Sequence, residues 1–82
     1  MARKDYRYTV IFEPLNAGGY QVIVPALPEI VTAGRTLEEA RQMARDAIRC
    51  ALGGMSKEKV PFPKDISKEP RTEKLRVILK AA

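Results

Sequence analysis

A chain of 82 residues with a net charge of +5 makes one small domain, residues 1–82, whose own core is limited. It contains no His and only one cysteine, Cys50, which excludes an intramolecular disulfide and leaves no donor set for zinc. No apolar run approaches the roughly 20 residues of a membrane span, and no signal-peptide core follows Met1, so a cytoplasmic protein is expected. The basic excess favours acidic partners or nucleic acid, although interspersed acidic residues leave a solvated mixed surface as the alternative.

Three strands are predicted in the first part of the chain. Tyr6–Glu13 alternates apolar and polar residues with the period of two that is typical of a half-buried strand. The turn-forming segment 14–19 separates it from a second short strand at Tyr20–Val24, and the pair predicts an antiparallel hairpin. Prolines at positions 25 and 28 then interrupt the ladder, and the β-branched stretch Glu29–Thr32 predicts a third strand that ends at Gly34.

One long helix is predicted at Thr36–Leu52. Thr36 is a favourable N-cap, and Glu39 three residues later completes a capping box. Gly53 can adopt the left-handed conformation that ends a helix, so the helix is expected to stop there. Apolar residues recur at spacings of three and four and form one face: Leu37, Ala40, Ala44, Ala47, Ile48 and Ala51.

The C-terminal part of the chain has a different character. Residues 56–73 are rich in proline and charge, and they are longer than most connections in compact domains, which predicts a functional segment or a mobile arm. Lys74–Lys80 returns to alternation and predicts a last strand, with a helical C-terminus as the alternative. Its inward side chains would be Leu75, Val77 and Leu79.

The predicted fold is therefore α+β, with the order β-β-β-α-β and an antiparallel sheet that carries one helix on one face. One helix covers only one face of a sheet. The other face is predicted to present an apolar strip made of Ile11, Ile23 and Ile78. Because such strips and unpaired strand edges tend to be contacts between copies, a homodimer or a higher homo-oligomer is expected.

No arrangement of residues typical of catalysis is present. Acid–base, nucleophilic and metal chemistry all need convergent side chains, whereas Glu38 and Glu39 are accounted for by helix capping and Asp46 by a solvent-facing position. Gly18-Gly19 lacks the strand–loop–helix setting of a phosphate cradle. We therefore predict no enzyme activity, no cofactor and no metal site.

Two features suit the binding of a partner. Arg41, Arg45 and Arg49 are spaced i, i+4, i+8 on the predicted helix, so they form a positive row that an acidic or phosphate-bearing partner would bind. A solvated helix face is the alternative. Phe62, in the proline-rich connection, is a candidate partner contact, and the alternative is that this segment is only a tether.

Short motifs follow one another in a definite order along most of the chain. They are Gly19-Tyr20, Val24-Pro25-Ala26-Leu27-Pro28, Gly34, Thr36-Leu37-Glu38-Glu39-Ala40, Ala44, Ala47-Ile48 and Val60-Pro61-Phe62-Pro63. Together, from about Tyr8 to Pro63, they resemble the HicB antitoxin domain. The chain departs from the family pattern at Glu29-Ile30, where a glycine-cysteine pair is common in the family.

This resemblance implies a partial ribonuclease-H-like fold of the type β-β-β-α-β, the order that the residues also predict. It further implies a prokaryotic toxin–antitoxin role, in which the domain binds and masks a small mRNA-cleaving HicA toxin. Longer members of the family add a DNA-binding domain. The residues after Pro63 are too few for one, so a short form without autoregulation is expected.

Two functional hypotheses follow. The first is a HicB-like interaction module that binds a HicA-like toxin protein. The second is a stand-alone oligomeric nucleic-acid-binding protein that uses its basic surface, and its binding would weaken steeply with salt.

Overall fold

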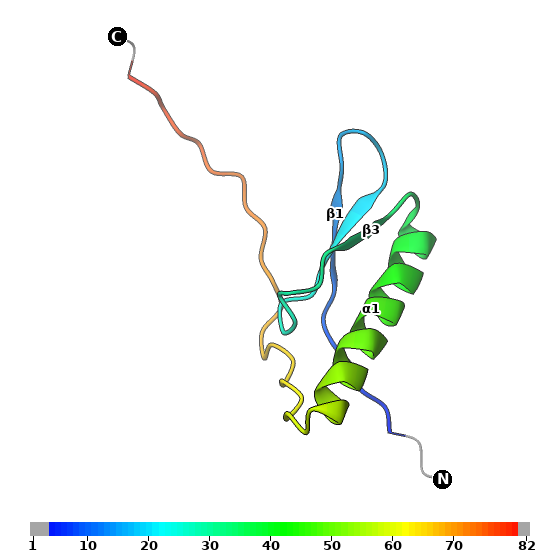
Figure 1. The fold of residues 1–82 in the computed structure, drawn as a ribbon. Coiled ribbons are helices and arrows are strands. Elements are labelled where there is room, and N and C mark those ends of the chain that lie inside the picture. The colour runs from blue at the N-terminus through cyan, green and yellow to red at the C-terminus, as the bar shows by residue number, and fades with distance from the viewer. Residues whose placement is uncertain (1–3, 81–82) are drawn as a thin grey trace.

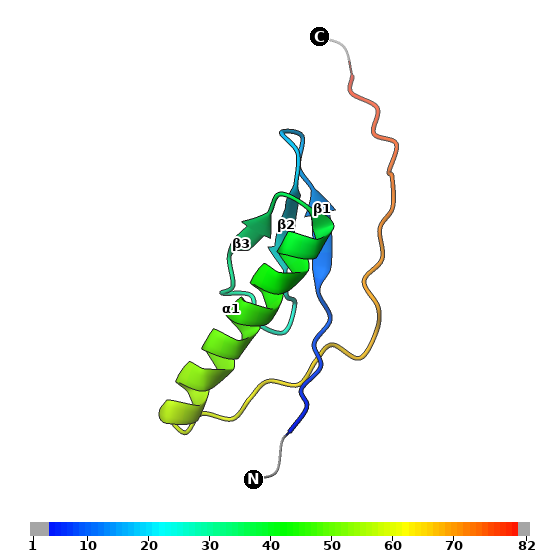
Figure 2. The ribbon, with the colours of Figure 1, turned by 90° about the vertical axis from the view of Figure 1, so that its right-hand side faces the viewer.

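The computed structural model describes residues 4–80. Strands β1 (Ile11–Pro14), β2 (Tyr20–Ile23) and β3 (Thr32–Gly34) are followed by helix α1 (Leu37–Lys57). The strands form one antiparallel sheet in the order β1-β2-β3, and α1 lies across one face of it (Figures 1 and 2). The predicted α+β class, with a single helix on a meander, is confirmed.

The ladder between β1 and β2 is shorter than the predicted strand at Tyr6–Glu13. Its register pairs Ile11 with Ile23 and Phe12 with Val22. Continued by two residues, this register would oppose Thr9 to Pro25, which has no N–H to donate. The ladder therefore stops at Ile11, and residues 4–10 pair with none of the described strands.

The core is small and lies between the sheet and the first half of α1. Val22 and Val24 point at the helix and pack against Ala40 and Ala44, whose small side chains let the two layers approach closely. Leu27, in the turn after β2, is 0% exposed and closes one end of this core. The turn is held by hydrogen bonds from the Leu27 N–H to the Val24 carbonyl and from the Ile30 N–H to the Leu27 carbonyl, at 2.9 and 3.1 Å.

The start of α1 confirms the predicted cap. The hydroxyl of Thr36 accepts a hydrogen bond from the Glu39 N–H at 3.0 Å, which satisfies one of the unpaired donors of the first turn. The Glu39 carboxylate accepts from the N–H of Arg35 at 3.4 Å rather than from the N–H of Thr36. In the standard capping box the carboxylate accepts from the N–H of the N-cap residue, whereas here it accepts from the N–H of the residue before the N-cap.

The predicted end of the helix at Gly53 is wrong. Helix α1 continues through Gly53 and Gly54 to Lys57, at a cost of about 1 kcal/mol for each glycine relative to alanine. The continuation is accompanied by burial, since Leu52 is buried and Met55 packs against the core. The helix then ends in a Schellman motif: the Val60 N–H donates to the Met55 carbonyl at 2.9 Å, and Lys59 adopts a φ of 59°.

The segment after α1 crosses beneath the sheet and then leaves the body of the molecule (Figure 2). Residues 74–80, where a last strand is predicted, are extended and exposed and pair with no strand of this chain. The structure differs from the predicted order here because a strand needs a neighbour to complete its hydrogen bonds, and this segment points away from both sheet edges (Figure 1). The molecule consequently measures 65 × 26 × 20 Å, and its radius of gyration of 16.6 Å exceeds the roughly 12 Å of a compact chain of this length.

Candidate functional site

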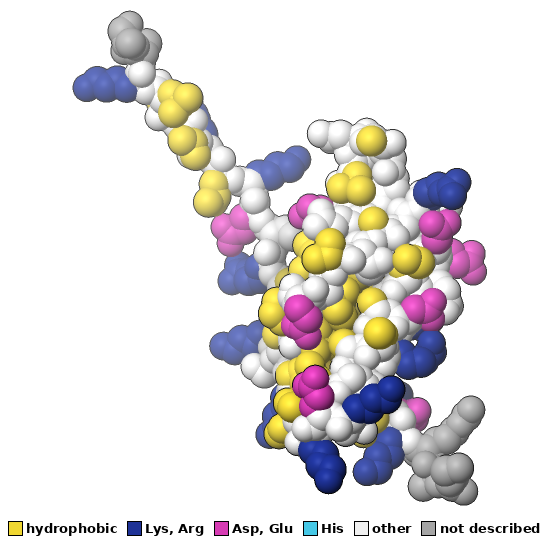
Figure 3. Space-filling view, viewed as in Figure 1, with side chains coloured by type: hydrophobic (Ala, Val, Ile, Leu, Met, Phe, Trp, Pro, Cys, Tyr) yellow, Lys and Arg dark blue, Asp and Glu magenta, His cyan; other side chains and the backbone are white. Residues whose placement is uncertain are grey.

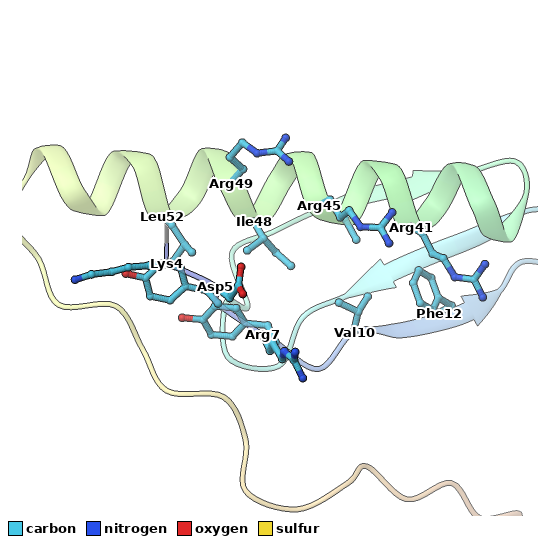
Figure 4. Close-up of a pocket in the computed structure, with 13 residues that line it drawn as sticks. Lys4, Asp5, Arg7, Val10, Phe12, Arg41, Arg45, Ile48, Arg49 and Leu52 are labelled. Carbon is cyan, nitrogen blue, oxygen red and sulfur yellow. The ribbon is translucent and has the colours of Figure 1, made fainter. Parts of the chain in front are cut away.

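A groove of about 640 Å³ runs between α1 and the first part of the chain (Figure 4). One wall is the N-terminal segment together with the start of the sheet, and the other wall is a flank of the helix. The first wall consists of residues 4–8 with Val10 and Phe12. The second wall consists of Arg41, Ala44, Arg45, Ile48, Arg49 and Leu52.

The groove combines an apolar floor with a basic rim. The apolar floor is made of Val10 and Phe12 from the sheet side and of Ile48 and Leu52 from the helix. Val10, just before β1, and Phe12, within it, face the same space because they are two residues apart; Ile48 and Leu52 do so because they are four apart on α1. A surface of this kind suits a partner that presents an apolar side chain next to an acidic group.

The basic rim contains the predicted arginine row, Arg41, Arg45 and Arg49, and the structure brings all three to the groove. Arg49 bends away from it and pairs with the Asp46 carboxylate at 3.0 Å (Figure 4). This pair is exposed, so it contributes little to stability. Within residues 4–80, Arg41 and Arg45 form no ion pair, and both guanidinium groups are therefore available to a partner.

Three hydrogen bonds to residues that follow α1 hold the first wall in position. The Asp65 carboxylate accepts hydrogen bonds from the Thr9 N–H at 2.9 Å and from the Thr9 hydroxyl at 2.8 Å. These hydrogen bonds from Thr9 lower the pKa of the Asp65 carboxyl below its ordinary value of 3.8, the backbone bond being the larger cause. The Tyr8 hydroxyl donates to the Pro63 carbonyl at 2.6 Å. We call these three hydrogen bonds the clasp.

Phe62 does not line the groove, but it contacts Tyr6, which does. Its ring lies edge-to-face against the ring of Tyr6, with the centroids 5.2 Å apart and the planes at 75°. Phe62 is half-buried by this contact, so its first role is to hold the N-terminal segment against the arm. Sequence reasoning missed the clasp, because a lone Asp in a charged, proline-rich segment carries no signal of which residue it will meet.

The three residues predicted as an oligomer face do not meet in one chain. Ile11 and Ile23 are cross-strand neighbours, as expected for one side of the sheet. Ile78 lies in the extended C-terminal segment and is 78% exposed. The role of the three in assembly stays a prediction.

The described residues offer no arrangement for metal binding. Among residues 4–80 no group of three or more His, Cys, Asp or Glu side chains lies close enough to hold an ion. The thiol of Cys50 is exposed on the helix and pairs with no other cysteine. No helix in this part of the chain is both long and apolar enough to cross a membrane.

The comparison with protein families gives a match over nearly all of the described chain. The family is described as the HicB-like antitoxin of bacterial toxin–antitoxin systems, and it matches residues 8–76. The chain belongs to this family. The match includes β1, the whole of α1, the clasp residues and all of the groove lining except residues 4–7.

Individual HicB-like relatives differ in length. Antitoxin HicB 1 of Photorhabdus laumondii is 41% identical over 68 residues, which cover 80% of this chain and 44% of the relative. Antitoxin HicB of Escherichia coli K12 is 35% identical over 63 residues, or 74% of this chain and 46% of the relative. The UPF0150 protein Ta0767 of Thermoplasma acidophilum is 38% identical over 63 residues and is covered to 91%. The chain thus spans less than half the length of these two HicB antitoxins, but most of the Thermoplasma protein.

Proposed function

We propose that this HicB-like domain is the antitoxin of a toxin–antitoxin pair and that it binds and masks a small HicA-type toxin without catalysing a reaction itself. The observation that carries the proposal is the family match over residues 8–76, which contains the helix wall of the groove and its arginine rim. Further support comes from the chemistry of the groove, which offers an apolar surface and free cations. The place of action that fits this role is the cytoplasm, where mRNA is found.

The arginine row is the proposed contact for the toxin. Arg41 and Arg45 are exposed and free of ion pairs in the described structure, so no neighbouring carboxylate offsets their positive charge. They stand one helical turn apart on the rigid scaffold of α1, which fixes the spacing of the two acidic groups that they would meet. Complementary charge of this kind steers association and selects the partner.

The proposal is tested by binding a HicA-type toxin encoded beside this chain to the purified protein. The double variant Arg41→Glu/Arg45→Glu is expected to weaken binding at least about tenfold, or about 1.4 kcal/mol, because it sets like charges against an acidic partner surface. The matched control is Lys68→Glu/Arg71→Glu, which makes the same change of charge on the exposed arm. It should bind as tightly as the parent chain.

A growth assay completes this test. Co-expression of the parent chain should rescue cells from the toxin, and the Arg41→Glu/Arg45→Glu variant should rescue them less well. No rescue and no binding by the parent chain would overturn the antitoxin proposal. Equal loss in both double variants would place the contact outside the arginine row.

A second candidate function is nucleic-acid binding by the same rim. It is favoured by the net charge of +5 and by the alignment of the arginines along one edge of the groove. Phosphate contacts release counterions, so RNA or DNA binding would fall steeply as salt is raised. A titration with RNA and DNA at low salt that shows no binding removes this candidate.

We also propose that copies of the chain assemble into a homodimer or a higher homo-oligomer. The buried core of the described residues contains only six hydrophobic side chains, and four of them are the small side chains of alanine and valine on the facing layers. Large apolar side chains remain exposed at the C-terminal segment and at Val31. A small domain with a small core commonly gains stability by association.

A further inference from the structure

The C-terminal segment 74–80 exposes more apolar surface than a monomer normally leaves in water. Leu75, Val77, Ile78 and Leu79 are between 76% and 87% exposed. The space-filling view shows these side chains as an apolar stretch along the outstretched segment, between basic residues (Figure 3). Because the removal of apolar surface from water is favourable, we expect the segment to be covered by another surface.

The free edge of β1 has the form of an acceptor for such a segment. In the described part of the chain β1 pairs only with β2, so its other edge has unpaired backbone groups. The apolar floor of the groove opens beside this edge, since Val10 and Phe12 project from it towards Ile48 (Figure 4). The other sheet edge, β3, is only three residues long.

The side chains of residues 74–80 would alternate between the two faces of a strand, and these two faces match the two sides of the sheet at the β1 edge. A strand placed next to β1 with Leu75, Val77 and Leu79 on the helix side would set three apolar side chains over the apolar floor. Ile78 would then lie on the opposite side of the sheet, the side that carries Ile11. A slip by one residue would place Arg76 against the arginine row, so the register is defined by both apolarity and charge.

We infer that residues 74–80 of one copy add as a strand to the β1 edge of a second copy, so that two chains exchange their C-terminal segments. The inference rests on the proposed self-association and gives it a geometry. Each chain has one open β1 edge and one extended segment, so two copies complete each other reciprocally around a twofold axis. The segment is already extended and directed away from its own sheet, so exchange needs no reversal of the chain (Figures 1 and 2).

The exchanged strand would divide the groove between two occupants. The apolar floor would be covered by the partner copy, whereas Arg41 and Arg45 at the rim would stay exposed to the toxin. The assembled dimer would thus present two arginine rows, one on each copy.

The first test is the mass in solution of three full-length chains by light scattering. The parent chain and Arg76→Gln are expected near twice 9.2 kDa, and Val77→Asp near 9.2 kDa at the same concentration. Both substitutions lower the net charge by one, but only Val77 faces the apolar floor in the inferred strand. The dissociation constant of Val77→Asp is expected to rise at least about 100-fold. Because position 77 is outside the core, the amide spectrum of β2 should be unchanged in all three.

The outcomes separate the two proposals. A monomeric parent chain overturns self-association and exchange together. A Val77→Asp variant that dimerises as tightly as the parent overturns the exchange alone and leaves self-association through another surface.

The second test identifies the acceptor edge and distinguishes exchange from docking within one chain. A nitroxide spin label is attached to the introduced thiol of the variant Cys50→Ser/Arg76→Cys. This spin-labelled protein, which contains no ¹⁵N label, is mixed with the ¹⁵N-labelled parent chain. Broadening of the Val10 and Phe12 amides in the mixed sample is expected. Absence of broadening between chains overturns exchange. Broadening at Thr32–Gly34 moves the acceptor to β3 and overturns the inferred site.

Discussion

Gly34 is the residue that decides how closely the sheet approaches the helix. A Cβ at this position would lie 2.6 Å from the Cα of Ala40 and 2.8 Å from the carbonyl carbon of Glu39. Both neighbours are backbone, so neither can turn aside as the end of a side chain would. The absence of a side chain at Gly34 and the methyl group of Ala40 therefore set the distance at which Val22 meets the helix.

We expect Gly34→Ala to lower the free energy of unfolding by about 1–3 kcal/mol, because the backbone must shift to relieve the overlap. The measurement is urea unfolding followed by circular dichroism. The same substitution at Gly53 is the control, since a Cβ there meets nothing within 4 Å. Gly53→Ala should raise the stability by about 0.5–1 kcal/mol through helix propensity. A Gly34→Ala variant with an unchanged free energy of unfolding would contradict the close contact between Gly34 and the helix.

At the scale of the elements, the arm that follows α1 determines where the N-terminal segment lies. The segment before β1 has no strand partner, and the clasp together with the ring contact of Tyr6 with Phe62 attaches it to the arm. The wall of the groove is thus built by residues more than fifty positions apart. Its geometry depends on a hydrogen-bonded carboxylate and therefore on pH.

Acid should open the clasp. The pKa of Asp65 is depressed in the folded chain, so its contribution to stability is complete above the ordinary value of 3.8 and is lost as the pH falls through the lower folded value. The Thr9 and Asp65 amide resonances should shift together in an NMR titration towards acid pH. In Asp65→Asn this transition should be absent, whereas Glu69→Gln, an exposed carboxylate on the same arm, should keep it. A Thr9 amide that does not respond to acid would contradict the clasp.

The elements also show what the sequence could predict and what it could not. Periodicity and capping predicted the start of α1, because Thr36 and Glu39 act within one turn of backbone. The end of α1 was missed, because the burial of Met55 outweighs two glycines and is a tertiary effect. The arginine row was predicted as a set by its spacing, but the groove beneath it was not, since its other wall comes from the N-terminal segment.

At the scale of the whole molecule, a small globular body carries an exposed apolar segment. The alternation that predicts a last strand at Lys74–Lys80 is present in the sequence, but within residues 4–80 this segment has no strand partner. A sequence pattern indicates which side of a strand is apolar. Whether that strand pairs within its own chain or with another chain depends on the path of the connection that precedes it. Under the proposed exchange, stability and assembly would be coupled.

We expect the melting temperature to depend on protein concentration. For an associating chain, a tenfold increase in concentration stabilises the folded assembly by about 1.4 kcal/mol, which corresponds to a rise of roughly 5 °C for a domain of this size. Scanning calorimetry at two concentrations measures the effect. Val77→Asp should show no such dependence, and a parent chain with the same melting temperature at both concentrations would contradict the coupling.

The clasp has a consequence for the order in which the molecule is made. The hairpin and the helix consist of near-neighbour contacts and can form as soon as they leave the ribosome, but Thr9 must wait until Asp65 has been synthesised. Closing so long a loop is entropically slower than forming local structure. The wall of the groove is consequently the last part of the body to settle, so a nascent chain acquires the complete groove only after Asp65 has been synthesised.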